Sequence, residues 1–81
     1  MGRYARAKRT ERILIGRLEE LARALERSGA PEQAVSRLLQ SASVATMNAV
    51  ALKLISAEAA DEIWRDAAER HPTLPPLRRA A

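Results

Sequence analysis

Two runs of apolar residues, each spaced by alternating steps of three and four positions, dominate this chain of 81 residues. The first run is Leu14, Leu18, Leu21 and Leu25, and the second is Val35, Leu38, Ala42, Ala45, Ala49 and Leu52. This spacing places each run along one side of an α-helix, as in a coiled coil. Between the runs, Gly29 suits the left-handed position after a helix, and Pro31 suits the first turn of the next one. The sequence therefore predicts an antiparallel helical hairpin.

A third, shorter helix is expected after Ser56, whose side chain suits an N-cap. The first helix is predicted from about residue 4 or 10 to residue 27. The second is predicted from residue 31 to about 55, and the third from residue 57 to about 69. The fold class is all-α, a hairpin plus a shorter third helix, assembled as a helical-bundle oligomer. Residues 1–9 form a basic arm that stands alone or continues the first helix. A single helical domain covers 10–71, and 72–81 is a proline-rich tail, extended or disordered.

Composition excludes several classes of protein. The chain contains no cysteine, which rules out disulfides and thiolate metal sites and is compatible with a cytoplasmic protein. Phenylalanine is also absent, so the core must consist of Leu, Ile, Val, Met and Ala. No secretory signal pattern is visible, and no run of 18 apolar residues predicts a membrane span. We expect a cytoplasmic protein without a membrane-spanning segment.

Catalysis is not expected, because a catalytic site requires several positioned titratable groups. The single histidine, His71, stands at a predicted helix end before a proline, and we interpret it as a C-cap. The acidic series Glu58, Glu62 and Asp66 is interpreted as a solvated helix face, because basic residues interleave with it. The sequence predicts no enzyme activity, no cofactor, no metal site and no small-molecule substrate.

The stretch 38–52 contains no charged residue, although a surface helix normally has a polar face. We therefore predict that it mediates self-association, with a dimer favoured. The predicted contact residues are Leu38, Ala42, Ala45, Asn48, Ala49 and Leu52. The alternative interpretation is a central helix in a monomeric bundle. Asn48 would fix the register of a helix–helix interface, or it would face water.

Two further groups of residues are candidates for binding. Trp64 and Ile63, on the apolar stripe of the third helix, form either a core anchor or an interface anchor. The basic residues of the N-terminal arm are possible polyanion contacts: Arg3, Arg6, Lys8 and Arg9. The alternative for the arm is a solubilising terminus.

These observations favour a small non-enzymatic protein–protein interaction module, an adaptor, regulator or assembly subunit, that acts through helix–helix packing. The alternative is a small nucleic-acid-binding regulator that uses the basic N-terminal arm. A helix-turn-helix reader is disfavoured, because the acidic third helix would repel phosphates. The salt dependence of polyanion binding would discriminate between the two functions.

Overall fold

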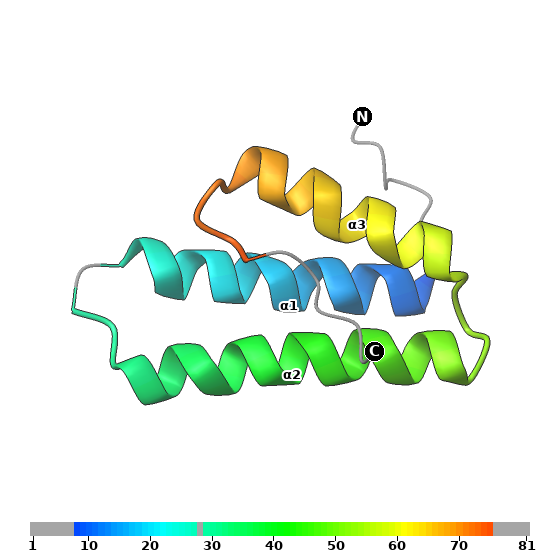
Figure 1. Ribbon diagram of the computed structural model, residues 1–81, viewed down its shortest axis with the longest axis horizontal. Helices are drawn as coiled ribbons and strands as arrows, with labels where there is room; N and C mark the ends of the chain where they lie inside the picture. Colours follow the sequence, from blue (N-terminus) through cyan, green and yellow to red (C-terminus); the bar gives the residue numbers. More distant parts are fainter. Residues whose placement is uncertain (1–7, 28, 76–81) are drawn as a thin grey trace.

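The computed structural model describes residues 8–27 and 29–75, and within them it contains three α-helices and no strand. The helices are α1 (Arg9–Glu26), α2 (Glu32–Ala51) and α3 (Ala57–Arg70) (Figure 1). The all-helical fold, with two long helices and a shorter third, is confirmed. The predicted assembly into an oligomer stays a prediction.

The three helices lie side by side in a thin layer, only 18 Å across along the shortest axis (Figure 1). The central helix is α1, which pairs closely with α2 on one side and with α3 on the other, whereas α2 and α3 make the fewest contacts. The leucine seam of α1, which consists of Leu14, Leu18, Leu21 and Leu25, faces the core. These leucines repeat at the helical period and therefore lie on one side of the helix. The seam therefore holds both outer helices.

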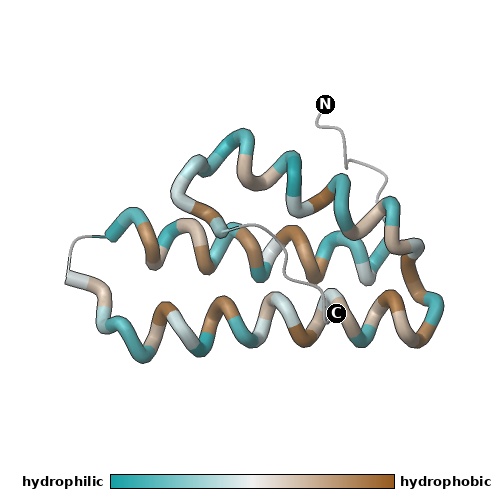
Figure 2. Tube along the Cα trace, viewed as in Figure 1, coloured by the Kyte–Doolittle hydropathy of each residue, from teal (hydrophilic) through white to brown (hydrophobic). Residues whose placement is uncertain are grey.

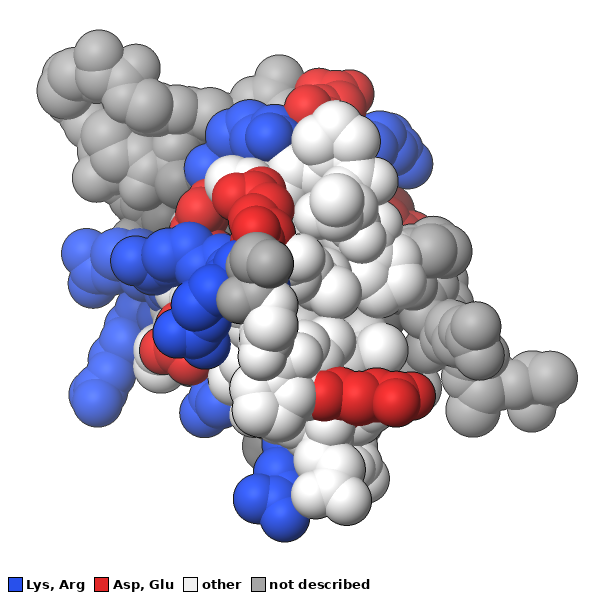
Figure 3. All heavy atoms as spheres, turned by 90° about the vertical axis from the view of Figure 1, so that its left-hand side faces the viewer, with Lys and Arg blue, Asp and Glu red and all other residues white. Residues whose placement is uncertain are grey.

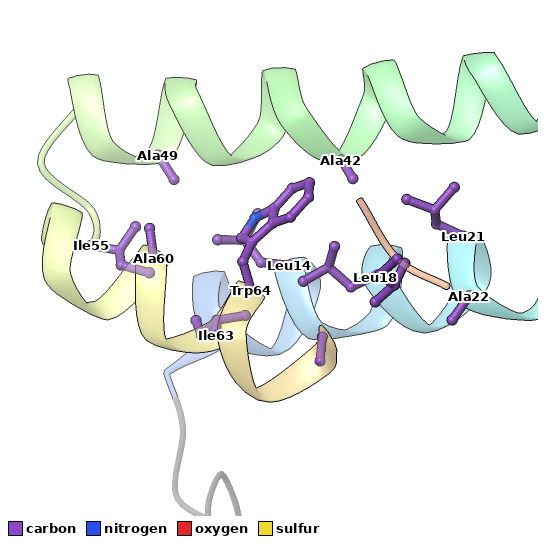
Figure 4. Packing of buried hydrophobic residues seen from close by; sticks show 12 residues of the cluster. Leu14, Leu18, Leu21, Ala22, Ala42, Ala49, Ile55, Ala60, Ile63 and Trp64 are labelled. Carbon is purple, nitrogen blue, oxygen red and sulfur yellow. The ribbon is translucent and has the colours of Figure 1, made fainter. Parts of the chain in front are cut away.

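The core is built from leucine, isoleucine, alanine and a single tryptophan (Figure 4). Its buried members are Leu14, Leu18, Leu21, Ala22, Ala42, Ala49, Ile55, Ala60, Ile63, Trp64, Ala67 and Leu74. Leu74 belongs to the segment that the sequence assigned to the tail. After α3 the chain turns back toward α1 (Figure 1), where the Leu74 N–H donates to the His71 carbonyl over 2.9 Å. Part of the predicted tail thus closes the core.

The ends of the helices follow from local hydrogen bonding. Ser56 caps α3 as predicted, with its hydroxyl accepting from the Ala59 N–H. In contrast, α2 ends at Ala51 and not near residue 55. There Lys53 has φ 59°. Its N–H donates to the Val50 carbonyl, and the Leu54 N–H donates to the Ala49 carbonyl. This Schellman motif usually carries glycine at the left-handed position, so the lysine gave no stop signal.

Trp64 links the two helices that contact each other least. Its indole N–H donates to the Thr46 hydroxyl over 2.9 Å, and this hydroxyl donates to the Ala42 carbonyl over 2.8 Å. Both side chains are buried, Trp64 with 4% and Thr46 with 1% of its surface exposed. The Thr46 hydroxyl therefore provides a hydrogen-bond acceptor for the indole N–H, which would otherwise be costly to bury.

Replacing Lys53 with glycine should stabilise the protein, because glycine adopts positive φ without the steric penalty of a Cβ atom. We expect Lys53→Gly to raise the free energy of unfolding by about 0.5–1 kcal/mol in urea denaturation. The matched control Lys53→Ala removes the same charge but keeps the Cβ atom, so it should give no gain. Equal stabilisation by both variants would contradict the backbone explanation.

Replacing Thr46 with valine should leave the indole N–H of Trp64 without an acceptor in the core. The cost of an unsatisfied buried donor is about 1–3 kcal/mol, measured as a loss of unfolding free energy. Thr46→Ser retains the hydroxyl and should cost less than Thr46→Val. A valine variant as stable as the original protein would mean that the hydrogen bond contributes nothing.

Candidate interaction surfaces

The structure separates the residues that the sequence assigned to self-association. Ala42 and Ala49 are buried inside the chain, beneath α2 on either side of the indole of Trp64 (Figure 4). Leu38 and Ala45 are partly buried against the same core. These positions therefore take part in packing within one chain.

Asn48 and Leu52, the other two predicted contacts, are exposed, with 69% of the Leu52 surface accessible. The predicted contact residues thus combine the buried side of α2 with two exposed residues beside it. The side of α2 that faces directly away from the core was not among the predicted contacts.

The outer face of α2 consists of Gln40, Val44, Met47 and Ala51, all exposed. These positions are spaced by three or four residues and lie opposite the buried positions 42, 46 and 49. Val44 and Met47 expose 49% and 38% of their surface. Figure 2 shows apolar and intermediate residues along the middle of α2. An uncharged face with two large apolar side chains is therefore turned to solvent.

A shallow groove continues this uncharged surface past the end of α2. Its apolar lining includes Val50, one turn after Met47, and Leu54, which is 54% exposed. The apolar part also includes Ile55, Ala57 and Ala59, and the polar lining residues are Lys8, Glu11, Lys53 and Ser56. Apolar surface accessible to a partner thus extends from the outer face of α2 to the start of α3.

Trp64 and Ile63, predicted as core or interface anchors, lie in the core of the single chain, each at least 96% buried. The indole points from α3 toward α2 (Figure 4). Of the two sequence-based interpretations, the structure places both side chains in core packing.

The basic N-terminal arm is only partly covered by the structure. Arg3 and Arg6 lie outside the described residues, whereas Lys8 and Arg9 are exposed where α1 begins. The role of the arm in polyanion binding stays a prediction.

Charge is unevenly distributed over the three helices. In Figure 3, which views the end where α1 passes to α2, basic side chains gather on the left-hand side and uncharged residues form a central band. The acidic residues of α3 line a surface of their own around Arg65: Glu58, Asp61, Glu62, Asp66 and Glu69. Each helix therefore presents a different kind of surface.

His71, the C-cap of α3, binds two carboxylates of α1. Its Nδ1 lies 2.9 Å from Oε1 of Glu26, and its Nε2 lies 3.0 Å from Oε2 of Glu19. The guanidinium of Arg70 lies 2.7 Å from Oε1 of Glu19. This oxygen is buried, and Arg70 is the charged group that it faces. Only the imidazolium form of His71 donates at both nitrogens. We call this arrangement the His71 clasp, because it fastens the end of α3 to α1.

The clasp raises the pKa of His71 above its usual value of 6.5. The hydrogen bond from His71 to the Glu26 carboxylate is the largest cause of the higher pKa, partial burial opposes it, and the hydrogen bond to Glu19 and the Glu19 charge add to it. The role of a helix cap, predicted from sequence, is confirmed for His71. The two glutamates were not predicted, because 45 and 52 positions separate them from His71.

Neither a metal site nor a membrane-spanning helix is found in the described part of the chain. Residues 8–27 and 29–75 contain no group of three or more acidic or histidine side chains placed to hold a metal ion. None of the three helices is long and apolar enough to cross a membrane. No protein-family model, curated protein or solved structure shows significant similarity to this chain.

Stability should depend on pH through the His71 clasp. Because the pKa of His71 is higher in the folded than in the unfolded chain, its contribution is complete below pH 6.5 and is lost as the pH rises through the folded-state pKa. We expect His71→Gln to destabilise the protein more at about pH 6 than at about pH 9, measured by urea denaturation at each pH. The control Glu32→Gln, at an exposed position on α2, should show no such difference. A loss that is equal at both pH values would contradict the clasp.

Proposed function

We propose that this protein is a non-enzymatic interaction module that self-associates through the outer face of α2. The exposure of Val44 and Met47 on an uncharged helix face carries the proposal. A contiguous apolar patch on the surface of a protein marks a candidate interaction site. The core of the chain is already closed by α1, α3 and Leu74, so this face is not needed for packing within the monomer.

A second copy is a suitable partner for chemical reasons. In a two-fold dimer the same patch meets itself, so like charges on the patch would face each other and repel. The outer face of α2 has no charge, and an antiparallel pairing would bring Val44 of one chain against Met47 of the other. The small side chain of Ala51 and the flexible one of Met47 favour close and adaptable helix contact.

An interface of this kind would be assembled from complete monomers. Each chain already has a closed core, and the contact would extend along α2 toward Leu54 and Val50 in the adjoining groove. The functions compatible with it are those of an adaptor, a regulator or an assembly subunit. The identity of a further partner would depend on the surfaces that the dimer leaves exposed.

The test is the mass in solution, measured by light scattering on a size-exclusion column across a range of concentrations. We expect the original protein to show twice the chain mass of 8.9 kDa, and Val44→Glu to show the mass of one chain with unchanged helicity in circular dichroism. A buried, unpaired carboxylate would cost several kcal/mol in the dimer, whereas in the monomer it would face water.

The matched control is Ile13→Glu, since Ile13 is also an exposed aliphatic residue but lies on α1. This variant should still form the dimer. A concentration-independent monomer for the original protein would overturn the proposal. So would dissociation by Ile13→Glu with an intact dimer in Val44→Glu.

A further inference from the structure

The solvent side of α1 carries a stripe of arginines. Arg9, Arg12, Gly16, Glu20, Arg23 and Arg27 are all exposed and follow one another at steps of three or four residues. We call these six residues the basic stripe. Arg17, beside the stripe, donates to the Ser41 hydroxyl on α2, and Arg37 of α2 is also exposed. Since the leucines of α1 point into the core, the stripe faces away from it.

Within residues 8–27 and 29–75, most charges of the basic stripe have no ion-pair partner. Among the residues that the structure describes, Arg9, Arg12 and Arg27 form no ion pair, and Arg23 donates only to the Glu19 carbonyl. Glu20 is the single acidic member of the stripe. The other acidic groups of α1 have different neighbours, since Glu19 and Glu26 bind the end of α3 and Glu11 lines the groove beside Lys53. The result is a concentrated positive field on one side of the molecule.

Gly16 stands in the middle of the basic stripe and has no role in packing within the chain. A Cβ atom added at this position would meet no heavy atom within 4 Å. Glycine inside a helix is less favourable than alanine by about 1 kcal/mol, so the fold itself would be better served by alanine. The missing side chain leaves a gap between Arg12 and Glu20, where a flat or convex surface can approach the helix backbone.

We infer that the basic stripe binds the phosphate backbone of a double-stranded nucleic acid. The stripe runs from Arg9 to Arg27, which is 18 helical steps or about 27 Å. A duplex presents one phosphate charge for about every 1.7 Å of its axis, so several phosphates lie within reach. Arginine suits this ligand, because its planar guanidinium donates two parallel hydrogen bonds to phosphate oxygens.

The binding should be independent of base sequence. The basic stripe contains no Asn or Gln to read adenine, and its arginines could read guanine only from within the major groove. In addition, α2 and α3 flank α1 in the same thin layer (Figure 1), so α1 is not free to enter a groove deeply. The contacts that remain are those to phosphates, which position a protein on nucleic acid without specifying a sequence.

Two other negatively charged partners fit the stripe less well. An anionic membrane surface favours a helix with an apolar side to insert, but the leucines of α1 are buried in the core. The acidic surface of α3 in a second copy has complementary charge, but Arg65 lies among its acidic residues and weakens its field. The basic stripe lies on α1 and the outer face of α2 is a separate surface, so this inference and the proposed self-association stand or fall independently.

The test is fluorescence anisotropy with two labelled duplexes of unrelated sequence, each of about 20 base pairs, followed by a salt titration. We expect the full chain to bind both duplexes equally at low salt. The double variant Arg12→Gln with Arg23→Gln should bind at least about tenfold more weakly, and the slope of log affinity against log salt should fall by about 2, since two phosphate contacts are lost.

Two further variants make the test specific. Lys53→Gln with Arg65→Gln removes the same net charge outside the stripe, and affinity should change by less than about twofold because salt screens distant charges. Gly16→Gln fills the gap without changing any charge. It should weaken binding while the melting temperature stays equal or rises, which separates an effect on binding from an effect on folding.

Several results would overturn the inference. One is no binding of the full chain to either duplex at low salt, and another is an equal loss of affinity in the charge-matched control. Loss of binding on deletion of residues 1–7, with the stripe variant unaffected, would assign the contact to the N-terminal arm. Equally tight, stripe-dependent binding to phosphatidylserine vesicles or to polyglutamate would assign the stripe to membranes or to acidic proteins. A stripe-dependent rise in mass at low salt without duplex would assign it to a second copy.

Discussion

The arrangement of the three helices depends on the burial of one indole ring. Trp64 is the single tryptophan of a chain that has no phenylalanine, and it fills the space between two helices that otherwise make little contact. A tryptophan can be buried only where its N–H finds an acceptor, and Thr46 provides it from α2. In a domain of this size, with about 4–12 kcal/mol of total stability, the position of α3 relative to α2 depends largely on this contact.

The indole also explains the small residues on the inner side of α2. Ala42 and Ala49 are buried on either side of Thr46, where larger side chains would occupy the volume that the ring takes (Figure 4). Their size is therefore accounted for within one chain. Val44 and Met47, on the opposite side, are exposed and lie outside the core cluster.

The three helices divide the surface according to charge. The exposed side of α1 is basic, α2 is neutral, and α3 is acidic on its outer side. The His71 clasp lies apart from the basic and acidic surfaces, because there α1 contributes the acidic groups and the end of α3 contributes the basic ones. Because the helices lie in one thin layer, each surface remains accessible while the other two are in use.

The sequence by itself determined the local structure. Helical periodicity predicted the number, order and approximate length of the helices, and side-chain chemistry predicted the cap at Ser56, the role of His71 at a helix end and the positive φ of Gly29. These features depend on residues close together in the chain. The end of α2 was predicted too late, because Lys53 occupies a backbone conformation that normally belongs to glycine.

Only the tertiary structure decided which side of α2 faces inward. In a helix with apolar residues on most sides, periodicity allows several orientations, and Trp64, from a distant part of the chain, selects the one with Ala42 and Ala49 in the core. The same reason applies to the clasp, whose glutamates lie 45 and 52 positions from His71, and to Leu74, which packs in the core cluster. The sequence thus determined that residues 38–52 carry no charge, whereas long-range packing determined that Val44 and Met47 are exposed.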